Sequence, residues 1–156
     1  MNTIIAIGYA NKGGNMEKWR ESVRRNVAFL KKLPYSIQLR IPYVLIIEHF
    51  FREGRDPEAA WEWAKAFETR AGQHNDFGGV ATAWLYQGWV LSLKGDDKGV
   101  LSVQKGLELF KRIGDEGYAN NCHWVIGTTF FNFGKVEEAK LHMSAFLRLA
   151  VQIQHR

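Results

Sequence analysis

Apolar residues recur at intervals of three and four along most of the chain, which is the spacing of a helix that buries one face. The segment Lys98 to Ile113 shows this most clearly, with Val100, Val103 and Phe110 among its apolar positions. No segment alternates with a period of two, so we expect no β-sheet. Further helices are expected at residues 4–11, 16–33, 43–52, 57–71, 81–93, 118–133 and 136 to roughly the end.

A glycine that closes an apolar segment and precedes a polar helix start occurs four times, at Gly14, Gly54, Gly95 and Gly134. The intervals between these glycines are 40, 41 and 39 residues. Glycine can end a helix because it adopts a left-handed conformation without a steric penalty from Cβ. We therefore interpret each glycine as the turn of a helical hairpin, and the recurrence as four hairpins.

The residues after these glycines suit the start of the second helix of each hairpin. Asn15, Asp56 and the pair Asp96/Asp97 are good helix N-caps, and Pro57 suits a first helical turn. Lys135 stands where the cap of the last hairpin is expected, so we expect a weaker helix start there.

Three stretches carry a similar pattern of aromatic, large and small residues at fixed spacing. They are His123-x-x-Ile126-Gly127-x-x-Phe130 with Ala139-x-x-x-Met143, Trp84-x-x-x-Gly88-x-x-Leu91 with Gly99-x-x-x-Val103-x-x-Gly106, and Ala59-x-x-x-Trp63-x-x-Ala66. These stretches resemble tetratricopeptide repeats, in which an aromatic residue, a large residue with glycine and a second aromatic residue are followed by small, large and small positions. The period near 40 is longer than the 34 residues usual in that family and resembles the long-repeat variety of large bacterial signalling regulators.

This resemblance implies an all-α fold, a right-handed superhelix of about four antiparallel helix hairpins within one domain, 1–156. The hairpins would occupy approximately residues 1–33, 40–72, 77–114 and 118–156. The first hairpin fits the pattern poorly, because its leading helix is short and Trp19, Val23 and Asn26 replace the small, large and small residues. It is either a divergent cap, or the chain begins partway through a longer array.

The same resemblance implies that the first helix of each hairpin faces a concave groove, and Trp89 lies on that side of its helix, one position after Gly88. Aromatic anchors mixed with amides and an arginine suit an extended peptide or a partner helix. The candidate groove residues are Val44, Glu48, Phe51, Arg52, Leu85, Trp89, Ser92, Asn121, Trp124, Thr128, Phe131 and Asn132.

The positive charge of the 156-residue chain is local. Its net charge is +5, whereas residues 12–40 alone carry eight Lys/Arg against Glu17 and Glu21. The basic helix within residues 18–32 could therefore meet nucleic acid. We favour a solvated outer face, because second helices line the convex side in the resembled family and Trp19, Val23, Val27 and Leu30 form a buried stripe. The sequence thus makes nucleic acid a weaker alternative partner.

Candidate catalytic and metal-binding residues find structural explanations. Cys122 and His123 are consecutive on a helix and so project about 100° apart, which argues against a thiol dyad. The five histidines lack the spacing of a metal site, and the glycines at 13–14 and 78–79 are explained as turns. We expect no catalytic residue, no metal and no cofactor. A single cysteine without a secretory leader or a membrane-spanning segment indicates a cytoplasmic protein.

The function we expect is a scaffold that binds a protein or peptide without catalysis. The alternative is a ligand- or peptide-responsive sensor region of a larger bacterial transcriptional or signalling regulator. Because the ends of a helical array expose apolar stacking faces, we also expect self-association through the Thr3 to Ala10 end or the Phe146 to Ile153 end.

Overall fold

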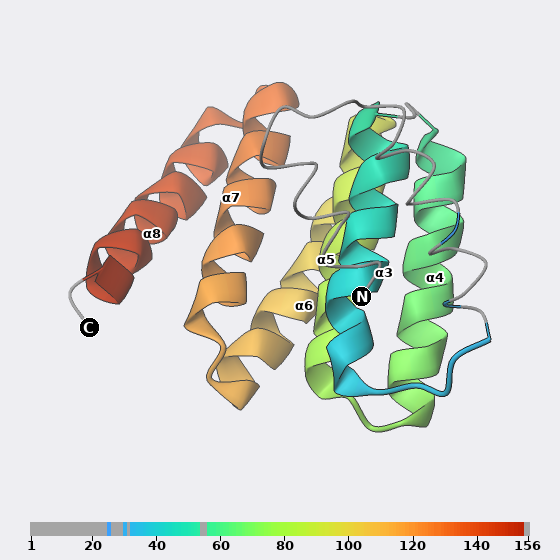
Figure 1. Ribbon diagram of the computed structural model, residues 1–156. Helices are drawn as coiled ribbons and strands as arrows, with labels where there is room; N and C mark the ends of the chain where they lie inside the picture. Colours follow the sequence, from blue (N-terminus) through green and yellow to red (C-terminus); the bar gives the residue numbers. More distant parts are fainter. Residues whose placement is uncertain (1–24, 26–29, 31, 54–55, 155–156) are drawn as a thin grey trace, which may run out of the picture. The chain divides into compact units, whose positions relative to one another are not determined.

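The computed structural model describes Arg25, Leu30, residues 32–53 and residues 56–154 (Figure 1). Every regular element in these residues is helical and none is a strand, which confirms the all-α expectation for this part of the chain. In chain order the elements are the 3-10 helix η1 (Ile37–Leu39), α3 (Arg40–Glu48), the π-helix η2 (His49–Glu53), α4 (Pro57–Gln73), α5 (Phe77–Leu93), α6 (Gly99–Ile113), α7 (Glu116–Asn132) and α8 (Val136–Gln154).

The first predicted hairpin lies almost entirely outside the described residues, as do its turn at Gly14 and most of the basic helix. Four of its residues are described: Arg25 and Leu30 have helical backbone, whereas Lys32 and Leu33 lie in a turn and a bend. Arg25 is exposed and Leu30 is buried. Leu30 thereby confirms its predicted place in the buried stripe, while Trp19, Val23 and Val27 lie outside the described residues.

The chain divides into two compact units, Met1–Trp63 and Ala64–Arg156, with the boundary inside α4. We call these the first and the second unit. In the first unit α3 begins three residues before the predicted start, because Pro42 fits within a first helical turn where no donor is lost. Its buried face includes Tyr43 and Ile47, and the Tyr43 ring lies 5.8 Å from that of Trp63 in the second turn of α4.

In the second unit the helices follow one another as neighbours. Helices α5 and α6 form one packed pair, α7 and α8 form another, and α6 also packs on α7. Figure 1 shows α7 and α8 side by side and running in opposite directions. The core between these helices contains fully buried Val103, Phe110, Cys122 and Ile126.

All four turns of the second unit have the same construction. In each, a residue with left-handed backbone follows the helix, and the next backbone N–H bonds to the carbonyl five residues earlier, which is the Schellman motif. These closing bonds are Asp76 N to Ala71 O, Asp96 N to Leu91 O, Asp115 N to Phe110 O and Lys135 N to Phe130 O, all 2.9 or 3.0 Å long. The left-handed residues are Asn75, Gly95, Gly114 and Gly134.

Gly95 and Gly134 therefore end their helices in the predicted way, with φ of 80° and 72°. Asn75 and Gly114 show that the connections between hairpins use the motif too. The sequence reading missed these two turns.

Aspartate side chains cap several helices, but not at every predicted position. The predicted Asp96/Asp97 cap of α6 is wrong, because the N-cap is Lys98, which makes no side-chain cap bond; Asp96 accepts instead from Lys98 N at 2.9 Å. Asp56 accepts a hydrogen bond of 2.9 Å from Ala59 N, which confirms its predicted role as a cap. Asp76 and Asp115 cap α5 and α7, accepting from Gly79 N at 2.9 Å and from Tyr118 N at 3.0 Å. The interpretation of residues 78–79 as a turn is wrong, because the Asp76 cap starts α5 at Phe77 and places both glycines in its first turn.

Two glycines bring α5 and α6 into backbone contact. A Cβ atom added at Gly88 would collide with the carbonyl oxygen of Gly99 and with the Val103 side chain, and one at Gly99 would lie 2.9 Å from Ser92 N. The small residues at these two positions therefore allow the helices to approach closely.

Candidate binding surface

Trp89 and Trp124 meet on the surface of the second unit, one from α5 and the other from α7. Their ring centroids are 5.3 Å apart and the rings are nearly perpendicular, at 86°. This is the edge-to-face arrangement that aromatic pairs prefer. Trp89 is partly buried and Trp124 is 36% exposed, so the pair offers aromatic surface while being held in place.

Five other predicted groove residues lie at helical spacing from one of these two tryptophans. Ser92 follows Trp89 by one turn on α5, and the other four lie within about two turns of Trp124 on α7. We call the set the tryptophan face. It consists of Trp89, Ser92, Asn121, Trp124, Thr128, Phe131 and Asn132.

The polar and apolar members of the tryptophan face are accessible to different degrees. The Ser92 hydroxyl donates to Gly88 O at 2.8 Å and the Thr128 hydroxyl to Trp124 O at 2.9 Å, so both are held by their own helices. The side chains of Asn121 and Asn132 are exposed, and Phe131 is 67% exposed. A partner would find an exposed ring, two free-standing amides and the tryptophan pair.

Leu85 does not belong to this surface. It is only 3% exposed and lies in the core beside Val103 and Ile126. The spacing of four residues from Trp89 placed it with the groove residues, but α5 is buried on most sides. We therefore assign Leu85 to packing.

The remaining candidates, Val44, Glu48, Phe51 and Arg52, belong to the first unit. Arg52 and Glu48 form an i, i+4 ion pair at 3.9 Å, and the Arg52 side chain is exposed. Phe51 and Arg52 were placed in the predicted groove by α-helical spacing, but both lie in the π-helix η2. A π-helix has hydrogen bonds from i to i+5, so successive side chains are rotated by a different angle than in an α-helix. Val44 is partly buried on α3.

A contact that the sequence did not predict joins α7 to α8. The Nδ1 atoms of His123 and His142 are 3.1 Å apart, so a neutral ring donates to its neighbour. Burial, together with the charges of His142, Lys111 and Arg148, lowers the pKa of His123 to about 4. Burial and Lys111 also lower the pKa of His142. The pair is therefore uncharged at neutral pH.

Cys122 points into the core and is fully buried. Burial and the charge of Asp115 raise the pKa of its thiol to about 12. A thiol with this pKa is protonated at neutral pH and is a poor nucleophile.

Among the residues that the structure describes, no three His, Cys, Asp or Glu side chains are grouped so that they could hold a metal ion. Within the same part of the chain, no helix is long and apolar enough to cross a membrane. Comparison with known proteins adds no relative: no family model matches the sequence, and no curated protein matches it.

Proposed function

We propose that this chain is a binding scaffold of stacked helical hairpins, similar to tetratricopeptide repeats, and that its tryptophan face binds an extended segment of a partner protein. The observation that carries the proposal is the partly exposed edge-to-face pair of Trp89 and Trp124, with the exposed Phe131 two turns further along α7. Tryptophan and other aromatic side chains contribute a large share of binding energy at protein interfaces.

The repeated Schellman turns support the architectural part of this proposal. Turns near residues 75, 95, 114 and 134 divide the second unit into helices of similar length, each joined to the next by the same motif. A right-handed superhelix of hairpins would follow if the same step were applied along the chain. In such an array α5 and α7 would both face the groove.

The polar members of the face support a peptide as the partner. An extended peptide presents backbone N–H and C=O groups at regular intervals, and the exposed amides of Asn121 and Asn132 can pair with both kinds. Because the tryptophan pair is held in place by packing, binding would cost little side-chain ordering.

The proposal is tested by capturing partners from the source cell on the immobilised protein and comparing variants by quantitative mass spectrometry. Phe131→Ala and Trp124→Ala should lose the captured protein. Leu141→Ala is the matched control, since Leu141 is also a largely exposed apolar residue but lies on α8. Circular dichroism would confirm that each variant is folded.

The first-unit candidates have their own test in the same assay. Arg52→Ala should weaken capture if α3 and η2 contribute to the same surface. If Trp89→Ala, Trp124→Ala and Arg52→Ala all retain the partner while Leu141→Ala loses it, the proposed surface is wrong and α8 is the binding element.

A further inference from the structure

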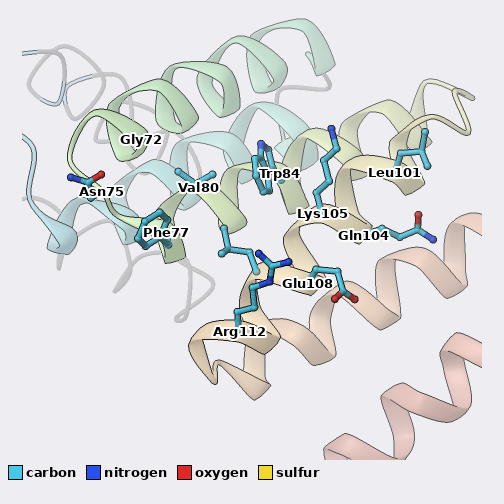
Figure 2. A pocket seen from close by; sticks show the side chains of 11 residues that line it. Gly72, Asn75, Phe77, Val80, Trp84, Leu101, Gln104, Lys105, Glu108 and Arg112 are labelled. Atoms are coloured by element: carbon cyan, nitrogen blue, oxygen red, sulfur yellow. The ribbon is translucent and has the colours of Figure 1, made fainter.

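A second surface feature of the same unit is a hollow of about 740 Å³ beside α6 (Figure 2). This volume falls within the range of about 300 to 1,000 Å³ found for binding pockets. Most of its lining is apolar, and one side of α6 supplies six of the lining residues at helical spacing. The lining consists of Gly72, Asn75, Phe77, Val80, Trp84, Leu101, Gln104, Lys105, Glu108, Leu109 and Arg112.

The indole of Trp84 is fixed in the wall of this hollow. Its Nε1 donates to Glu68 Oε1 at 2.8 Å, while Gln87 Nε2 and Lys65 Nζ each donate to Glu68 Oε2 at 2.8 Å. Burial raises the pKa of Glu68, but these hydrogen bonds outweigh it and the net shift is downward. The carboxylate therefore stays charged at neutral pH and keeps Trp84 in place.

Two large apolar side chains of the lining are mostly in contact with solvent. Phe77 at the start of α5 is 57% exposed, and Leu101 on α6 is 60% exposed. A small molecule seated inside the hollow would leave the outer surfaces of both side chains in water. An occupant that lies across the hollow, such as a helix, would cover them and gain the hydrophobic free energy of that area.

The charges around the hollow favour an acidic occupant. Lys105 and Arg112 line it, and neither forms an ion pair with any carboxylate in the described part of the chain. Glu108 lies between them on α6 and forms an exposed ion pair of 3.4 Å with Lys111, so the lining holds two cations against one carboxylate that already has a cationic neighbour. Figure 2 shows the side chains of Lys105 and Arg112 extending from α6 at separate points along the hollow.

The spacing of these two cations indicates the form of the occupant. Lys105 and Arg112 are seven residues apart, which is two helical turns and roughly 10 Å along the axis. A helix lying alongside α6 with two acidic residues seven positions apart would bring a carboxylate to each cation. Its apolar face would meet Phe77, Trp84 and Leu101.

We propose that this hollow is a docking site for an acidic amphipathic helix of another protein. The chain's own residues 12–40 carry an excess of positive charge and would be repelled by Lys105 and Arg112. The site is separate from the tryptophan face in its residues and does not depend on the function proposed above.

The probe for this site is a synthetic peptide of about 15 residues, close to the minimum length for an isolated helix. It has leucines at i, i+3, i+4 and i+7 and two glutamates seven positions apart, and its twin has lysines in place of the glutamates. Fluorescence anisotropy of the labelled peptides is measured against the full chain at low salt. We expect the acidic peptide to bind about tenfold more tightly than the twin.

Matched variants locate the binding. Lys105→Gln with Arg112→Gln should reduce the affinity for the acidic peptide about tenfold and remove its advantage over the twin. The control is Lys98→Gln, an exposed lysine of the same region outside the hollow, and it should change affinity less than twofold. Leu101→Ser should abolish binding, whereas Leu141→Ser on α8, where Leu141 is similarly exposed, should not.

Three results would overturn the proposal. The acidic peptide and its lysine twin could bind equally, or Leu101→Ser could leave binding unchanged. Alternatively, dodecanoate could saturate the site and displace the peptide at concentrations where dodecyl alcohol does not, which would assign the hollow to a small amphipathic anion. Trp124→Ala should leave peptide binding unchanged, so failure here is distinguishable from failure of the tryptophan-face proposal.

Discussion

Substitution of Gly88 by alanine tests the close backbone contact between α5 and α6. A new Cβ at this position would collide with the Gly99 carbonyl oxygen and the Val103 side chain and would lie 3.0 Å from Val103 N, so two of the three obstacles are backbone atoms of α6. A flexible side chain could turn away, but a backbone cannot. The two helices would have to separate for Gly88→Ala to be accommodated.

Two opposing contributions decide the effect of Gly88→Ala on the free energy of unfolding. Overpacking a well-packed interior typically costs about 1 to 3 kcal/mol, and contact with backbone places Gly88→Ala near the upper value. Replacing a helical glycine by alanine stabilises the folded protein by roughly 0.5 to 1 kcal/mol, because alanine lowers the conformational entropy of the unfolded chain. We therefore expect a net loss of about 2 kcal/mol, which corresponds to a fall in Tm of roughly 4 to 8 °C.

Gly117→Ala is the matched control. Gly117 is also helical, in the first turn of α7, but its added Cβ would meet only Asp115 Oδ1, at 3.7 Å. Thermal unfolding followed by circular dichroism should show Gly117→Ala unchanged or slightly stabilised and Gly88→Ala destabilised. If both variants shift Tm upward, the backbones of α5 and α6 are not in contact at Gly88 and the packing described above is wrong.

Three other predictions concern the pH dependence, the cysteine and the end of the chain. The pKa of His123 is lowered to about 4 from its ordinary value of 6.5. Between these two pH values its imidazole is therefore protonated in the unfolded chain but neutral in the folded protein. The free energy of unfolding, measured in urea, should therefore fall from about pH 6.5 to about pH 4, and a His123→Gln variant should show a smaller fall. Because Cys122 is buried with a thiol pKa of about 12, a thiol reagent should label it at pH 8 only in denaturant; rapid labelling of the native protein would contradict its placement. Leu147 and Val151 are exposed near the end of α8, so light scattering should show self-association at high concentration that Leu147→Glu weakens, and a strict monomer would count against it.

The helices could be predicted largely because two local signals agree. The helical spacing of apolar residues predicted the positions of α4 to α8 to within a few residues. Gly95 and Gly134 predicted where α5 and α7 end. Gly78 was misread because the sequence alone does not show that Asp76 caps a helix through Gly79 N. The cap, and not the glycine, decides where α5 begins.

Surface residues were harder to predict than helices. The resemblance placed Trp89 and Trp124 on one surface, but it did not show that Leu85 lies in the core instead. The reason is that α5 buries polar residues such as Thr82 and Gln87 as well as apolar ones, so no polar stripe marks a solvent side. Periodicity identifies a buried face only where another face is exposed.

Contacts between distant residues gave no signal in the sequence. His123 and His142 are 19 positions apart on different helices, and only the packing of α7 on α8 brings their nitrogens together. The positions of Lys105 and Arg112 on one side of α6 are visible in the sequence, but the hollow also needs Phe77 and Trp84 from α5. Tertiary packing creates the site from residues that are individually ordinary.

The recurring turn has a consequence for how such a chain can change. Each closing bond lies within six consecutive residues, so α4, α5, α6 and α7 can each stop correctly before any distant part of the chain has folded. A gene segment that encodes one helix and its turn therefore also encodes the residues that end that helix. Duplication or loss of a pair of helices would then alter the number of elements without requiring a new kind of joint, which makes length the property of this protein most open to evolutionary adjustment.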